Sequence, residues 1–313
     1  MCGSRALVGL KRRALRVAID VMSLSPSTLP RSVNLVHVKA PRTDRNDPGL
    51  REHLARLHAL DAPLQWQLAV LAHLLGPDNP RELVVWRDAA RGVHDADVLL
   101  DDVQSLPHCH RLPWFEHFAR LLAPGPVEPR HALIGAARRL MVADGMVTSA
   151  EQLQWVALRH LLAGSAVAPP TAAHADLADL GDAPAHAVCV FSGFLSQLLP
   201  APEVTLDLDG HEPVGQGWYD SVTSPWSDRF EAPPRERQDI DATLRALREL
   251  QALPWLLRPV LVRRWFDATR VLTDGSQLHP AAADALRLTC TLLDSPVPPE
   301  LGRQYTEVIP ARH

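Results

Sequence analysis

The sequence is poor in lysine and in long apolar runs. Lys11 and Lys39 are its only lysines, so arginine supplies the other 30 of its 32 basic residues, a bias that we attribute to coding composition. No run approaches the ~18 apolar residues of a membrane-spanning helix, so no transmembrane segment is predicted. The net charge is −4. Without an excess of positive charge, the composition argues against a nucleic-acid partner.

Cysteines are few and scattered. The four are Cys2, Cys109, Cys189 and Cys290, and no C-x-x-C pair occurs. Metal ribbons and dithiol redox sites need closely spaced cysteines, so this spacing excludes both classes. It indicates a reduced, cytoplasmic setting.

Catalytic signatures are also missing. No H-E-x-x-H places two imidazoles and a base on one helix face, and no G-x-S-x-G marks a hydrolase nucleophile. Ser192 of "FSGF" lies in an apolar, helix-like run. The densest group of potential ligands is "LPHCHRLPWFEHF", where we place His108 and His110 in a loop before a helix. We therefore predict neither catalytic residues nor a cofactor, and do not expect an enzyme.

The sequence does contain many apolar residues at helical spacing. In segments such as "PLQWQLAVLAHLLG" they recur with a period of 3.6 residues, and few segments alternate with period two, so the fold is predicted to be all-α. We divide the 313 residues into five parts. They are an irregular N-terminal segment (1–46), a first helical region (47–200), a loop or linker (201–232), a second helical repeat packed on the first (233–301) and a tail (302–313).

The predicted linker is unusual because it is long and contains four aromatic residues, Trp218, Tyr219, Trp226 and Phe230. It exceeds the length of an ordinary connection. We expect these aromatics to fold back over a helical face. The alternative is that they form a loop that binds a partner.

A sharp corner separates two helical runs in "MVADGMVTSAEQ". Gly145 ends the first run, since glycine adopts the left-handed conformation at little cost. Thr148 and Glu151 match the S/T-x-x-E capping box that begins a helix. The spacing therefore predicts a helix–turn–helix with Leu140 on the buried face of its first helix.

A second corner occurs in "RVLTDGSQLHPAAADALRL". Gly275 is placed to stop the preceding helix and Pro280 to open the next one. We expect Leu272 to lie in a core shared with Leu140. Just upstream, "RPVLVRRWF" carries a group of arginines that we interpret as a solvated helix face: Arg258, Arg263 and Arg264.

The segment from "LPWFEHFARLL" to "LRHLL", which contains the first corner, resembles the cytoplasmic C-terminal helical region of bacterial membrane zinc metallopeptidases of the HtpX and CAAX-protease type. The second corner and its "LLDSPVPPEL" continuation resemble the end of that region, and "LAVLAHLLGPDNPRELVVW" resembles its beginning. The resemblance covers about residues 60–301. The membrane helices and H-E-x-x-H of those peptidases are absent, so it implies an accessory region without the peptidase activity.

Both corners also resemble the helical fold of the tellurite-resistance protein TerB, a duplicated bundle whose acidic corner residues are linked to metal. This resemblance implies metal-binding roles for Asp144, Glu151 and Asp274.

Two functional hypotheses follow. The first is a non-catalytic helical accessory module that binds a protein partner, either a membrane protease or a second copy of itself. It would be cytoplasmic, and associated with the membrane only through that partner. The alternative is a TerB-like protein that binds a divalent metal, or responds to metal stress, through its acidic corners.

Overall fold

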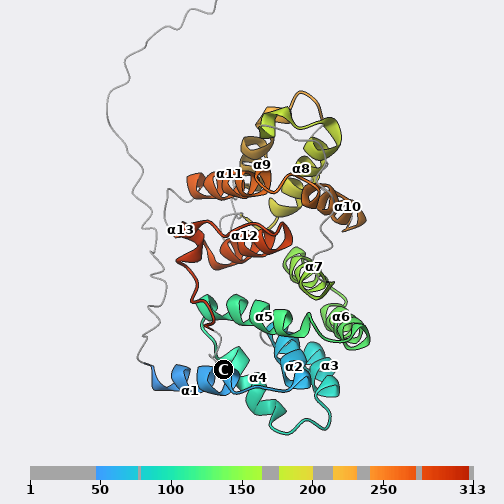
Figure 1. The fold of residues 1–313 in the computed structure, drawn as a ribbon, viewed down its shortest axis with the longest axis vertical. Coiled ribbons are helices and arrows are strands. Elements are labelled where there is room, and N and C mark those ends of the chain that lie inside the picture. The colour runs from blue at the N-terminus through green and yellow to red at the C-terminus, as the bar shows by residue number, and fades with distance from the viewer. Residues whose placement is uncertain are drawn as a thin grey trace, which may run out of the picture. The chain divides into compact units, whose positions relative to one another are not determined.

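The computed structural model describes residues 47–76, 79–163, 176–199, 214–230, 240–272 and 277–309. Thr43–His313 form one compact unit. Within the described ranges every regular element is helical, which confirms the predicted all-α fold (Figure 1). None of the helices described is long and apolar enough to cross a lipid bilayer.

The α-helices are α1 (Pro48–His58), α2 (Pro63–His73), α3 (Pro80–Ala89), α4 (Ala96–Gln104), α5 (His108–Leu122), α6 (Val127–Met141), α7 (Ser149–Ala163), α8 (Asp182–Leu195), α9 (Val214–Thr223), α10 (Ile240–Gln251), α11 (Leu257–Leu272), α12 (Pro280–Leu292) and α13 (Pro299–Gly302). Two short 3₁₀ helices, η1 (Leu177–Asp179) and η3 (Ser224–Trp226), complete the described elements.

Several helices begin at a residue whose side chain caps the first turn. The carboxylate of Asp47 accepts a hydrogen bond from the Gly49 amide at the start of α1. The side chain of Asn79 accepts bonds from the Arg81 and Glu82 amides at the start of α3. Both caps precede a proline, whose fixed φ suits the first helical turn and whose missing amide costs nothing there.

The amino-terminal helices pack around α2, which contacts α3, α4, α5 and α6. Five consecutive residues of α2, 68–72, are buried, because neighbours cover it on several sides. Trp86 of α3 is fully buried and its indole donates a hydrogen bond to the Leu68 carbonyl at 3.1 Å. The indole therefore closes the gap between α2 and α3 without leaving its polar atom unsatisfied.

Helix α7 connects this region to the carboxyl-terminal helices. It packs on α5 and α6 and also on α12, which in turn contacts α11 (Figure 1). Helix α7 is the second helix of the first corner and α12 that of the second, so the second helices of the two corners contact each other. Pro280 opens α12, as the sequence predicts.

The predicted linker is partly helical. Helix α9 lies inside residues 201–232 and packs on α8 and α11. Trp218 and Trp226 are fully buried, in agreement with the prediction that the aromatics cover a helical face. The Trp218 indole donates to the Thr269 hydroxyl at 3.1 Å. The sequence suggested a loop because the segment is long and contains many Pro, Gly, Asp and Ser residues, but burial of aromatic side chains outweighs that weak preference.

Leu140 and Leu272 do not share a core as expected. Leu140 is 1% exposed, whereas Leu272 is 40% exposed. The expectation for Leu272 is wrong because it is the last residue of α11. The buried stripe of that helix ends one turn earlier, at Thr269.

Candidate functional site

The first acidic corner forms the predicted turn. Gly145 has φ +83°, the left-handed conformation expected where the helix stops. One Asp144 carboxylate oxygen accepts from the Met146 amide at 2.8 Å, and the other from the Asn79 side chain at 3.3 Å. The Asp144 side chain therefore stabilises the turn and ties it to the start of α3.

The predicted capping box is also present. The Glu151 carboxylate accepts from the Thr148 amide at 2.6 Å, and the Glu151 amide donates to the Thr148 hydroxyl at 3.2 Å. Glu151 thus serves the start of α7. Asp274 and Gly275 of the second corner lie outside the described residues. Metal binding by Asp144, Glu151 and Asp274 stays a prediction.

Sequence reasoning missed a third carboxylate near the first corner. Glu82 is buried at the start of α3 and accepts hydrogen bonds from the Gly76 amide and the Asn79 side chain. Burial, together with the negative charges of Glu151 and Asp144, raises the pKa of Glu82. Glu82 is far from Asp144 and Glu151 in sequence, so no short motif links it to the corner.

His108 and His110 lie in helix α5 and not in a loop before it, so the predicted loop placement is wrong. His108 is the first residue of α5, and its Nε2 lies 2.9 Å from a carboxylate oxygen of Asp284. The Tyr305 hydroxyl donates to the other oxygen of Asp284 at 2.7 Å. This set of contacts joins α5 to α12 and to the carboxyl-terminal segment.

Another group of potential ligands, His53, Asp101 and Asp102, has its donor atoms within 4.8 Å of one another. Arg56 already donates to both carboxylate oxygens of Asp102, at 3.0 and 2.9 Å from Nε. Burial disfavours the charged carboxylate, but hydrogen bonds from Arg56 and His53 outweigh it and lower the pKa of Asp102. The Asp102 carboxylate is therefore already paired with a cationic side chain.

Ser192 has no access to a substrate. It is fully buried in α8 and its hydroxyl accepts a hydrogen bond from the Trp265 indole at 2.9 Å. The helix-like run seen around it in sequence is helix α8.

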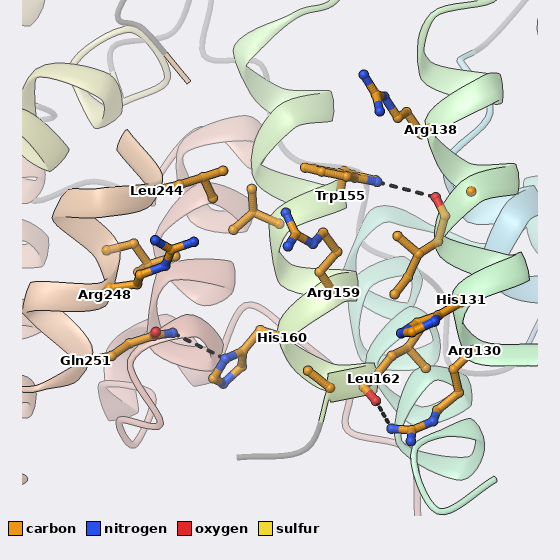
Figure 2. Close-up of a pocket in the computed structure, with 15 residues that line it drawn as sticks. Arg130, His131, Arg138, Trp155, Arg159, His160, Leu162, Leu244, Arg248 and Gln251 are labelled. Atoms are coloured by element: carbon orange, nitrogen blue, oxygen red, sulfur yellow. Dashed lines mark hydrogen bonds between the residues drawn. The ribbon is translucent and has the colours of Figure 1, made fainter. Parts of the chain in front are cut away.

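Helices α6, α7 and α10 form a groove with a volume of about 780 Å³ (Figure 2). We call it the basic groove. It carries four arginines and two histidines, and no aspartate or glutamate is among its described lining residues. The cationic members are Arg130, Arg138, Arg159, Arg248, His131 and His160.

Trp155 supplies the aromatic surface of the basic groove. Its indole donates to the Ile134 carbonyl of α6 at 3.4 Å, and the Arg159 guanidinium lies 4.7 Å from the ring centroid. A guanidinium stacked on an indole is held by cation–π attraction. Trp155 therefore restricts the position of the Arg159 guanidinium, which belongs to the residue one helical turn further along α7.

Two of the cationic residues are already engaged by the protein. Arg130 donates to the Leu162 carbonyl at the end of α7. His160 lies between Gln251 of α10, 3.2 Å from Nδ1, and the Asp294 carboxylate, 3.0 Å from Nε2. These contacts hold α6, α7 and α10 around the groove, so Arg130 and His160 build the site rather than offer free donors.

The other three arginines have no such partner. Among the described residues, no carboxylate pairs with Arg138, Arg159 or Arg248, although ion pairs are common elsewhere in the fold. Figure 2 shows the Arg159 and Arg248 guanidinium groups directed toward each other across the groove, from α7 and α10. Like charges placed in this way repel, and a bound anion would relieve the repulsion.

Comparison of the chain with protein-family models, with curated proteins and with solved structures returned no match.

Proposed function

We propose that this protein is a non-catalytic helical interaction module, which binds an acidic segment of a protein partner in the basic groove. The observation that carries the proposal is a groove, also lined by Trp155, in which Arg138, Arg159 and Arg248 have no carboxylate partner among the described residues. Uncompensated cationic side chains in a concave surface favour a partner of opposite charge, both in encounter rate and in specificity.

The chemistry of the lining favours binding over catalysis. The described lining residues include no serine, threonine, cysteine, tyrosine, lysine or carboxylate, so the groove offers neither a nucleophile nor a carboxylate base. Its apolar members, among them Ile134, Val156 and Leu244, suit the aliphatic side chains of a peptide. An arginine- and tryptophan-containing surface is also typical of binding hot spots.

The resemblance to the helical region of membrane zinc metallopeptidases supports the same role. A module without catalytic residues fits an accessory part that contacts a membrane protease or a second copy of itself in the cytoplasm. The chain offers one acidic stretch of this kind in its own sequence, "PEVTLDLDGHEP", with four carboxylates and no lysine or arginine. The metal-binding alternative has no contact in the described residues that favours it over turn formation.

The test is binding of a fluorescently labelled peptide of alternating glutamate and leucine, measured by anisotropy at low and physiological salt. We expect saturable binding that weakens with salt, since exposed charges are screened. Arg248→Glu should weaken it about tenfold or more, equivalent to about 1.4 kcal/mol.

The matched control is Arg87→Glu, which makes the same charge change at an exposed position of α3 outside the groove. If the two variants weaken binding equally, only net charge matters and the groove is not the site. Absence of any saturable binding would reject the proposed function.

A further inference from the structure

The three arginines of the basic groove that lack a carboxylate partner in the described part of the chain come from three different helices. Arg138 belongs to α6, Arg159 to α7 and Arg248 to α10. A stripe along a single helix would be an ordinary solvated face, but Arg159 and Arg248 face each other from two helices that only the fold brings together, while Arg138 lies on the other side of the Trp155 indole (Figure 2). The facing pair therefore defines a site rather than a surface property of one helix.

A single carboxylate is a poor match for this set. It carries one negative charge and two oxygens, whereas each guanidinium presents a planar array of N–H donors suited to bidentate contacts. A phosphate monoester carries a charge of about −1.5 to −2 at pH 7 and three acceptor oxygens. It can accept from both facing guanidinium groups at once and offset more of their mutual repulsion.

Part of this arrangement is in place before a ligand binds. The Trp155 ring holds the Arg159 guanidinium at 4.7 Å, and the Gln251–His160 contact at 3.2 Å joins α10 to α7. Side chains ordered in advance lose less entropy when a ligand arrives. Arg159 and Arg248 are thus positioned on opposite walls before binding.

The rest of the lining indicates what carries the phosphate. Ile134, Val156 and Leu247 provide apolar surface beside the arginines, which suits residues flanking a modified side chain. Trp155 is the only aromatic among the described lining residues, and single-stranded nucleic acids are usually bound by a basic track with several stacked aromatics. The lining therefore favours a protein segment over a nucleic acid.

We propose that Arg159 and Arg248, from facing walls of the basic groove, bind the phosphate group of a phosphorylated serine or threonine in a partner protein segment. This inference rests on the proposed function and specifies its ligand. Arginine clusters recognise phosphorylated motifs through charge-assisted hydrogen bonds.

The experiment compares three labelled peptide libraries with randomised flanking positions and one central residue: phosphoserine, glutamate or serine. The full chain is immobilised and retention of each library is measured. We expect the phosphoserine library to be retained at least about tenfold more than the glutamate library, and inorganic phosphate to compete.

Arg159→Lys distinguishes phosphate recognition from charge alone, because lysine keeps the charge but not the bidentate fork. We expect it to reduce the preference for phosphoserine over glutamate, while Arg87→Lys leaves that preference unchanged. Circular dichroism of each variant should match the parent, since these arginines are exposed.

The outcomes separate the two proposals. The phosphoserine and glutamate libraries could be retained equally, and both could be lost in Arg248→Glu. That result would overturn phosphate recognition and leave the proposed function standing. Retention of neither library would overturn both. Binding of single-stranded RNA that is equally tight and is lost in the same variants would replace the phosphopeptide with a nucleic acid and overturn the inference.

Discussion

Glu116 of α5 and Arg287 of α12 form a buried ion pair, with 2.9 Å between a carboxylate oxygen and Nη2 and a sequence separation of 171. Both side chains are at most 3% exposed. The Thr291 hydroxyl and Arg120 also donate to Glu116, so its carboxylate is well satisfied. The pair ties the first helical region to the carboxyl-terminal helices.

We expect Glu116→Ala to lower the free energy of unfolding by about 3 kcal/mol or more, because it leaves the Arg287 charge buried with only Glu307 beside it. Urea denaturation measures this. Arg120→Ala, the control, removes an exposed partner of the same carboxylate and should cost less than about 1 kcal/mol. If Glu116→Ala and Arg120→Ala lowered the free energy of unfolding equally, a buried unpaired charge on Arg287 would carry no extra cost, contrary to this prediction.

His73 should make stability depend on pH. Burial, with a smaller contribution from the Arg111 charge, lowers the pKa of His73 to about 3, and its Nε2 has no hydrogen-bond partner among the residues that the structure describes. The unfolded chain binds this proton at a pKa of about 6.5, so the free energy of unfolding should fall as the pH drops from about 6.5 toward 3.

Replacement of His73 by leucine should remove this contribution, which we expect to be about 1–2 kcal/mol at pH 5 relative to pH 7. Denaturation at both pH values tests it. His94→Leu is the control, because the His94 side chain is 93% exposed. An unchanged pH dependence in His73→Leu would contradict the burial argument.

Gly145 should be sensitive to substitution for a purely conformational reason. Its φ is +83°, and an added Cβ would meet no atom within 4 Å. Gly145→Ala should therefore cost about 1 kcal/mol from backbone strain alone. Gly135→Ala, within α6, should instead stabilise by about 0.5–1 kcal/mol, since alanine favours the helix. Thermal denaturation should give shifts of opposite sign.

The described helices of residues 47–309 should unfold together. Leu140→Ala should cost about 2–5 kcal/mol because it leaves a cavity in the core. Leu272→Ala should cost less than about 1 kcal/mol, since Leu272 is 40% exposed. Chemical denaturation followed by both tryptophan fluorescence and circular dichroism should show one transition. Two steps would indicate that the helical regions unfold independently.

Metal should have little effect if the acidic corner serves only to form a turn. We expect Zn²⁺, Mg²⁺, Ca²⁺ and Mn²⁺ to leave the melting temperature unchanged, because Asp144 and Glu151 already accept protein hydrogen bonds. Elemental analysis should find far less than one zinc per chain, and casein should remain uncleaved. A stabilising ion whose effect disappears in Asp144→Asn would favour the metal-binding alternative.

Local features were predictable from the sequence because neighbouring residues determine them. The all-α fold follows from apolar periodicity. The turn at Gly145 and the capping box of Thr148 and Glu151 follow from residue types within a few positions of each other. No distant contact is needed to form such a corner, so its geometry is visible in a short stretch.

Other positions were misread because distant parts of the chain decide them. Arg258 was interpreted as part of a solvated face, yet it is only 8% exposed. Its guanidinium donates hydrogen bonds to the Leu253 carbonyl after α10 and to the Leu293 carbonyl after α12. These bonds satisfy backbone acceptors just beyond the ends of two helices. The α9 helix likewise depends on burial of Trp218 against α11.

The basic groove belongs wholly to the tertiary structure. By itself the sequence determined helices, their caps and the position of the first corner, which are short-range properties of backbone and side chain. Only the packing of α6, α7 and α10 decided that Arg138, Arg159 and Arg248 share one hollow without a carboxylate partner among the described residues. Electrostatic interactions act through space, so residues far apart in the chain become one site only after the fold brings them together.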